Sequence, residues 1–246
     1  GVRWDYESPL SERFDRQNRG FDATAPSPLK VPGLDLRGGL LFTDSKNRLP
    51  FKRDLNNWQP RLGVAYQLRR STVLRGGYGV SYLPTFDTGY NNGFSIATPY
   101  VSSVDGGITP SGRWSNPYPD GIKQPYGRSL GLATMLGLSF TYGYPDRVIP
   151  YVHQYSFGFQ QELPGRVLVD ISYVGSRTRM LQTAKGINAV PADKLALGSD
   201  LLTPVPNPFQ GLLPGTAFNG PTVPRQQLLR PFPHFNNITE ARHSIG

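Results

Sequence analysis

One segment of the chain, Gly127-Arg-Ser-Leu-Gly131, matches the Gly-x-Ser-x-Gly pattern that surrounds the nucleophilic serine of many hydrolases. The pattern supports catalysis only where a strand leads into the serine and a helix leaves it. Here it follows Gln124-Pro-Tyr126, and no alternation of strands and helices accompanies it. Only three histidines are present to act as a base. We therefore expect a chance match in a loop, no catalytic residue and no enzyme activity.

The sequence also lacks the residue patterns of metal-binding and cofactor-binding sites. Cysteine is absent, which excludes disulfides and thiolate metal sites. No histidine or carboxylate pair has metal-binding spacing, and His153 is better explained as a residue at a membrane interface than as a metal ligand. The glycine-rich stretch Arg75-Gly-Gly-Tyr-Gly79 lacks the lysine and the strand–loop–helix context of a phosphate loop. We expect no metal and no cofactor.

The net charge of +9, from 26 basic and 17 acidic residues, raises the question of an anionic partner. The basic residues are dispersed over turns and loop shoulders, such as Arg69-Arg70, and form no stripe or basic helix. This distribution argues against nucleic acid. It suits solvated loops, or loops that meet lipopolysaccharide phosphates or another anion.

Two pairs of alternating segments dominate the chain. Residues 151–163 and 166–176 flank Pro164-Gly165, and residues 60–68 and 73–83 flank Arg69-Arg-Ser-Thr72. In each segment apolar and aromatic side chains alternate with polar or glycine positions, as in a strand with one apolar face and one polar face. Each arm has roughly the 9–11 residues with which a tilted strand crosses a bilayer. Length, and aromatic residues near the strand ends, favour an all-β, antiparallel transmembrane β-barrel segment over a soluble sandwich.

The connections alternate between short and long. We expect about six strands, at 1–8, 59–68, 73–83, 152–163, 166–176 and 237–246, with tight turns at 69–72 and 164–165. Long links cover 9–58, 84–151 and 177–236, with irregular excursions at 20–39 and 211–224 and short helices at 130–138 and 192–197. Outer-membrane barrels have short periplasmic turns and long extracellular loops. Six strands leave open edges, so we expect the 246 residues to be a fragment of one larger barrel domain.

Both hairpins resemble a known family. The runs Asn57-Trp-Gln-Pro-Arg-Leu-Gly-Val-Ala-Tyr66 and Leu74-Arg-Gly-Gly-Tyr-Gly-Val-Ser-Tyr82 are similar to the barrel of Oar-like TonB-dependent receptors. So are Tyr151-Val-His-Gln-Tyr-Ser-Phe-Gly-Phe-Gln-Gln-Glu-Leu-Pro-Gly165 and Asp170-Ile-Ser-Tyr-Val-Gly-Ser176. The resemblance is strongest in the hairpins and weakest at 20–50 and 85–145.

The resemblance implies a transporter of the Gram-negative outer membrane with a barrel of about 22 strands. It implies that a signal peptide, a β-sandwich and a plug domain belong to the complete receptor, and we expect these parts to lie outside this chain. The implied partners are outer-membrane lipid and lipopolysaccharide, a TonB-type energy-transducing protein that acts through the plug, and an unidentified small ligand, peptide or glycan.

Ligand contacts are expected from aromatic side chains in the long loops, because aromatic faces stack on sugars and grip peptides. The candidates are Tyr90, Phe94, Trp114, Tyr118 and Tyr126. A lumen-facing ion pair is also expected, because Arg75 and Glu162 come level if their two strands are antiparallel neighbours. The alternative is that the five aromatic residues have only a structural role and pack the loops together.

Two other functions remain open on the sequence alone. One is a soluble, secreted β-rich module that binds carbohydrate, which predicts that the apolar strand face is buried under a second sheet. The other is a surface adhesin built on the same barrel without uptake. A barrel instead predicts one exposed apolar band about 25 Å tall, containing Leu62, Val64, Tyr78, Phe157, Val169 and Ile171.

Overall fold

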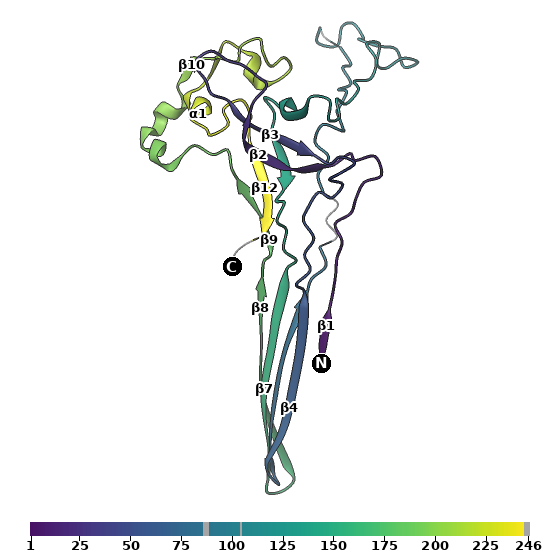
Figure 1. Ribbon diagram of the computed structural model, residues 1–246, viewed down its shortest axis with the longest axis vertical. Helices are drawn as coiled ribbons and strands as arrows, with labels where there is room; N and C mark the ends of the chain where they lie inside the picture. The colour runs from purple at the N-terminus through teal and green to yellow at the C-terminus, as the bar shows by residue number, and fades with distance from the viewer. Residues whose placement is uncertain (86–88, 104, 244–246) are drawn as a thin grey trace.

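The structure is a computed structural model that describes residues 1–85, 89–103 and 105–243. Long strands form one tall sheet with tight turns at its lower end, and the long connections gather at its upper end (Figure 1). We call the described parts of residues 9–53, 84–147 and 180–243 the cap. Among the described residues, no helix is long and apolar enough to cross a membrane.

The tall sheet has the strand order β1-β4-β5-β7-β8, and every neighbouring pair is antiparallel. Its strands are β1 (Val2–Trp4), β4 (Trp58–Arg69), β5 (Thr72–Tyr82), β7 (Tyr151–Leu163) and β8 (Val167–Arg179). These bounds confirm five of the six expected strands, although β1 is shorter than the range 1–8. Turns of a few residues join β4 to β5 and β7 to β8, also as expected.

The strand register collects the apolar side chains on one side of the tall sheet. Tyr78 lies opposite Leu62 of β4 and Tyr155 of β7, and Phe157 lies opposite Tyr173 of β8. Leu62 and Phe157 remain 70% and 56% exposed. The expected exposed apolar band is therefore confirmed, and no second sheet covers it within the described residues. The soluble-module alternative, which required burial of this face, is not what the structure shows.

The opposite side of the tall sheet, which we call the lumen face, is mainly polar, although Leu168 and Val174 also lie on it. Gly77 and Ser156 lie directly opposite one another there, and Gln154 lies opposite Ser176. A Cβ atom at Gly77 would come within 2.9 Å of the Ser156 hydroxyl oxygen. Glycine at this position therefore keeps space free on the lumen face.

The expected approach of Arg75 and Glu162 is wrong. Arg75 lies opposite Gly158, and the Glu162 amide instead donates a 2.8 Å hydrogen bond to the Ser71 carbonyl oxygen. The two side chains share the lumen face but are offset by four residues along β7. Neighbouring strands of a barrel are staggered, and turn positions alone do not define that stagger.

The cap contains strands where the sequence predicted irregular chain. The range 20–39 is a hairpin of β2 (Asn18–Pro26) and β3 (Arg37–Phe42), with register shifts that obscure the alternation. A three-stranded sheet joins β6 (Phe140–Gly143), β12 (Ile238–His243) and β9 (Gln182–Gly186), and its β6–β12 pair is parallel. The expected strand 237–246 is thus β12, in the cap and not in the tall sheet; its residues 244–246 lie outside the described part.

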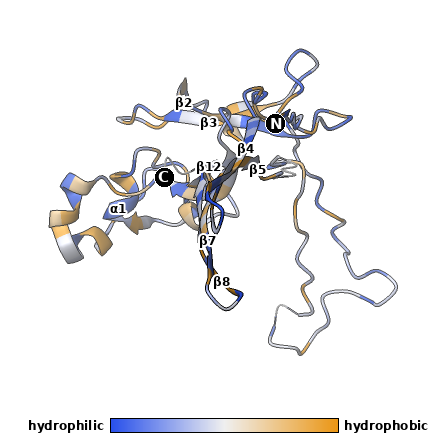
Figure 2. Ribbon diagram, turned by 90° about the horizontal axis from the view of Figure 1, so that it is seen from below, coloured by the Kyte–Doolittle hydropathy of each residue, from blue (hydrophilic) through white to orange (hydrophobic). Residues whose placement is uncertain are grey.

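Short elements complete the cap. The range 211–224, expected to be irregular, contains η3 (Ala217–Asn219) and β11 (Thr222–Pro224), and β11 pairs with β10 (Pro204–Pro206). Helices occur at η1 (Gly131–Ala133), η2 (Ala192–Leu202) and α1 (Arg225–Leu228). The first two lie where the sequence predicted short helices. Figures 1 and 2 show that residues 95–103 and 105–125 extend away from the strands and the rest of the cap.

Two apolar clusters give the cap a core of its own. One cluster contains Val31, Leu36, Phe209, Leu213, Phe218 and Val223. The other contains Leu40, Phe140, Tyr142, Phe232, Phe235 and Ile238. Buried amides pair with backbone groups beside these clusters: Asn188 donates to the carbonyl oxygens of Phe232 and Phe235 at 2.9 and 3.1 Å. Such satisfied amides fix loop conformations that apolar packing alone leaves free.

A buried ion pair joins the cap to the upper end of the tall sheet. Arg147, whose side chain is 4% exposed, contacts the Glu7 carboxylate at 3.0 Å. Glu7 also accepts hydrogen bonds from the Thr85 amide and hydroxyl at 3.1 and 3.0 Å. Burial works to raise the pKa of Glu7, but these hydrogen bonds and the Arg147 charge outweigh it and lower the pKa. Removing Glu7 would leave the buried charge of Arg147 without its partner, which is strongly destabilising.

We predict that an arginine in the apolar band destabilises the protein more than one on the lumen face. Phe157 lies in the middle of β7, so Phe157→Arg should cost about 2–4 kcal/mol in a bilayer. Ser156→Arg is the matched control, because its side chain points to the polar side. Urea unfolding in phospholipid vesicles measures both. Equal losses for the two variants would contradict the assignment of faces.

We also predict that the cap weakens as the pH falls from about 6.5 to about 4. His234 is fully buried beside Phe235, and burial lowers its pKa to about 4. In this window the unfolded chain binds a proton that the folded cap excludes, so folding loses on the order of 3 kcal/mol. Hydrogen exchange of cap amides, corrected for intrinsic rates, measures the loss. The pH dependence of cap stability should become flatter in the variant His234→Leu and should stay unchanged in His153→Leu.

Candidate ligand-binding site

A hollow of about 540 Å³ on the cap brings together two of the aromatic residues that the sequence singled out. We call it the aromatic hollow. It is lined by Leu10, Ser11, Glu12, Arg16, Gln17, Gly89, Tyr90, Asn91 and Phe94. Two chain segments, 10–17 and 89–94, therefore supply its walls, and both belong to links that connect strands of the tall sheet.

The segment that carries Tyr90 and Phe94 is held by the beginning of β2. The Asn18 amide donates to the Tyr90 carbonyl oxygen at 2.6 Å, and the Asn92 amide donates to the Asn18 side-chain oxygen at 2.7 Å. Phe94 packs its ring edge-on against Phe42 at a centroid distance of 5.8 Å. One end of the β2–β3 hairpin thus positions the aromatic wall.

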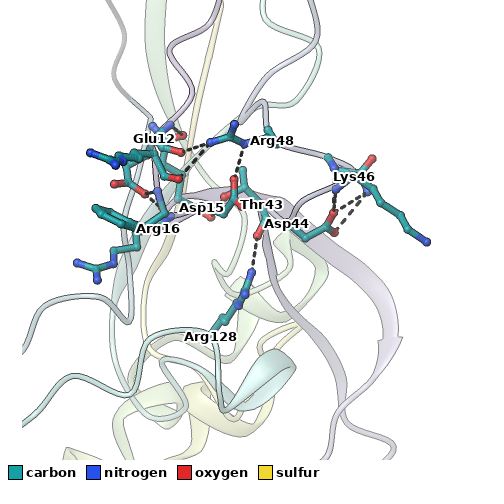
Figure 3. Close-up of polar contacts among 12 residues, drawn as sticks. Glu12, Asp15, Arg16, Thr43, Asp44, Lys46, Arg48 and Arg128 are labelled. Atoms are coloured by element: carbon teal, nitrogen blue, oxygen red, sulfur yellow. Dashed lines mark hydrogen bonds and ion pairs between the residues drawn. The ribbon is translucent and has the colours of Figure 1, made fainter.

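The opposite wall is a turn that folds around its own acidic residue (Figure 3). The Glu12 carboxylate accepts hydrogen bonds from the amides of Phe14 and Arg16 at 2.7 and 2.9 Å. Arg48 fastens this turn from another segment. Its Nε donates to the Asp15 carboxylate and its Nη2 to the Glu12 carbonyl oxygen, both at 2.9 Å.

The segment that carries Arg48 has its own local support. The Asp44 carboxylate accepts hydrogen bonds from the amides of Lys46 and Asn47, both at 2.8 Å, and these bonds hold the pKa of Asp44 below its ordinary value. Arg128 reaches the Thr43 carbonyl oxygen at 3.5 Å (Figure 3). Three segments that are distant in sequence therefore meet beside the aromatic hollow.

Two guanidinium groups lie on the turn that forms one wall of the aromatic hollow. The guanidinium groups of Arg13 and Arg16 lie 5.5 and 4.9 Å from the centroid of the Phe14 ring, which is 60% exposed. Arg16 also lines the hollow beside Tyr90. Planar guanidinium groups bind carboxylates and phosphates, and aromatic rings stack on sugars or peptide side chains. The arrangement suits a small ligand that combines an anionic group with a flat or cyclic one.

The other three predicted aromatic residues lie elsewhere. Tyr126, 62% exposed, lines a separate and mainly apolar cavity of about 430 Å³ together with Leu130, Leu138 and Leu212. Tyr118 packs against Tyr100 at 6.3 Å on the extended segment 95–125, and Trp114 on the same segment is 98% exposed. Tyr90 and Phe94 therefore share one hollow, and the five residues do not form a single site.

Sequence reasoning missed the polar residues that shape the hollow. Arg48 and Asp15 are 33 positions apart in the sequence, and Asn18 and Asn92 are 74 positions apart. No local sequence pattern therefore predicts that either pair is in contact. The one local signal is the density of charge around Glu12 and Arg16, which is equally typical of a solvated loop.

Ser129 and His153, which the sequence analysis considered for catalysis and metal binding, each hydrogen-bond a neighbouring group. Ser129 lies in a turn and donates its hydroxyl to the Tyr126 carbonyl oxygen at 2.6 Å. His153 shares a 2.7 Å hydrogen bond with the Tyr78 hydroxyl on the apolar side of the tall sheet. In the part of the chain that the structure describes, no group of three potential ligands is placed to hold a metal ion.

The chain was compared with known protein families, curated proteins and solved structures. A family model described as "Outer membrane beta barrel domain" matches residues 1–245. Neither a curated protein nor a solved structure matches the chain. The family match spans the tall sheet, the cap and the aromatic hollow together.

We predict that Arg48→Ala loosens the turn that forms one wall of the hollow. The change removes two charge-assisted hydrogen bonds that the Arg48 guanidinium donates, one to the Asp15 carboxylate and one to the Glu12 carbonyl oxygen. Amide exchange at Phe14 and Arg16 should become at least several-fold faster. Arg37→Ala is the matched control, because Arg37 pairs with the nearby Asp35 on an exposed surface. Unchanged exchange in the Arg48 variant would contradict the proposed fastening role.

Proposed function

Because the chain belongs to the outer membrane beta barrel domain family, we propose that it forms part of the barrel of an Oar-like TonB-dependent receptor. In this role the protein binds an extracellular ligand and admits it to the periplasm. The two hairpins that resemble the Oar-like receptors support this narrower assignment. Binding and passage involve no covalent step, and the proposal assigns no enzyme activity.

The observation that carries the proposal is the asymmetry between the two ends of the tall sheet. Tight turns close the lower end, whereas the connections at the upper end fold around two apolar clusters and enclose the aromatic hollow. A passive pore does not need extracellular loops that fold around an apolar core of their own. A receptor does, because a rigid scaffold must position the loops that select its ligand.

Hydrogen bonding at the sheet edges supports a larger, closed barrel. Among the described residues, the outer edge of β8 and the outer edge of β4 below Arg61 pair with no strand. Unpaired backbone groups are not tolerated against lipid, so further strands must complete them. In this role the tall sheet is one sector of the barrel, and TonB coupling belongs to a plug region outside this sector.

The ligand class follows from the hollow and from the lumen face below it. Arg16 beside Tyr90 favours an anionic small molecule, peptide or glycan. The serine, glutamine and glycine positions of the lumen face suit passage of a hydrophilic solute without strong trapping.

A surface adhesin is the second candidate, favoured by one observation. The described part of the segment 95–125 extends away from the rest of the cap, and its Trp114 is almost fully exposed, as in an adhesive loop. Deletion of this segment would abolish attachment of cells to a surface if the protein is an adhesin. It would leave attachment unchanged if the protein is only a receptor.

We predict energy-dependent depletion of one solute class from the medium. Cells that express the complete protein, cells that lack it, and cells that carry Arg16→Gln with Tyr90→Ala are incubated in spent medium, and solutes are followed by mass spectrometry. Wild-type cells should deplete an anionic compound, collapse of the proton gradient should stop the depletion, and the double variant should slow it at least ten-fold. Depletion that survives gradient collapse would indicate a passive pore and contradict the proposal.

A further inference from the structure

Two arginines occupy the apolar side of the tall sheet at the upper end of β8. The register places Arg177 opposite His153 and Arg179 opposite Tyr151. These positions alternate in phase with Val169, Ile171 and Tyr173, which belong to the exposed apolar band of the sheet. Both guanidinium groups therefore project on the side that faces lipid.

On that side, the described strands β4, β5, β7 and β8 contain no carboxylate that compensates these charges. Below Arg177, the lipid-facing positions of β7 and β8 contain no lysine, arginine, aspartate or glutamate. The carboxylates of these two strands, Glu162 and Asp170, lie on the lumen face near the lower end. Among the described residues neither Arg177 nor Arg179 makes a salt bridge. The two charges are left for a partner outside the chain.

Aromatic rings beside the arginines mark the level of the membrane interface. Tyr151 lies 5.3 Å from both Tyr82 and His153, measured between ring centroids. The Tyr78 hydroxyl and His153 Nδ1 are 2.7 Å apart, which holds the imidazole ring in place. Such a girdle lies where acyl chains give way to polar headgroups. The arginines flank this girdle at the end of the strands nearest the cap.

The free-energy cost of a lipid-facing arginine depends on its depth in the bilayer. A lipid-facing arginine costs roughly 2–4 kcal/mol at the bilayer midplane and about 0–1 kcal/mol near an interface. At the upper interface the available counter-charges are lipid headgroups, and guanidinium groups bind phosphate with paired hydrogen bonds. We propose that Arg177 and Arg179 bind the phosphate groups of a phosphorylated glycolipid in the outer leaflet, with Tyr151 and Tyr82 against its sugar rings. This site is distinct from the aromatic hollow and does not depend on the transported ligand.

The test uses the complete protein in phosphatidylcholine nanodiscs, with diphosphoryl lipid A as the probe and native mass spectrometry as the readout. The double variant Arg177→Gln/Arg179→Gln should bind lipid A roughly thirty-fold more weakly, because each arginine near a membrane surface contributes roughly five-fold. Arg69→Gln/Arg70→Gln removes the same charge at the lower turn and should change binding less than two-fold. Equal weakening of both double variants would overturn the site and leave only a general effect of charge.

Two further measurements keep the proposal testable if the upper double variant fails to fold. Dephosphorylated lipid A should bind the unaltered protein about as weakly as lipid A binds the upper double variant; equal affinity for both lipids would overturn the role of phosphate. Inorganic phosphate at millimolar concentration should not displace lipid A. Full displacement would show that the arginines bind a free anion and not a lipid headgroup.

Discussion

The structure depends on one constraint: in lipid, every backbone amide and carbonyl must find its hydrogen bond within the protein. The tall sheet meets it through the antiparallel ladders that run from β4 to β8. A strand of this kind has two sides, so the side chains separate into an apolar band and a polar lumen face. The tight turns, the exposure of Phe157 and Leu62 and the glycines of the lumen face follow from that separation.

Two kinds of stabilisation therefore coexist in one chain. The tall sheet has few buried apolar side chains, and its apolar band relies on lipid in place of a protein core. The cap lies above that environment and is organised as a water-soluble domain is, around Phe209 and Phe235, which are both fully buried. The ion pair of Glu7 with Arg147 joins the two regions. The cap and the apolar band of the tall sheet are thus stabilised by separate physical interactions.

The sequence predicted the parts whose signal is local. Alternation along β7 and β8 located both strands within a few residues, because a period of two depends only on neighbours in the chain. The β2–β3 hairpin escaped notice, because register shifts and residues such as Gly20 and Asp22 interrupt its alternation. The stagger of β5 against β7 and the contact of Arg48 with Asp15 join distant segments, which no local pattern encodes. Of the five aromatic residues chosen from the loops, Tyr90 and Phe94 share a hollow because Asn18 and Phe42 bring them there.

The most direct test of the account is to measure which residues of β7 face lipid. Because the chain has no cysteine, single cysteines at successive positions from 152 to 162 can each carry one spin label in the reconstituted complete protein. Collision with dissolved oxygen, which concentrates in lipid, and with a water-soluble nickel complex then reports the surroundings of each label. The account predicts a period of two, with labels at Tyr155, Phe157 and Phe159 in lipid and labels at Gln154, Ser156 and Gly158 in water. Uniform exposure of all positions to the nickel complex would contradict a membrane-spanning sheet.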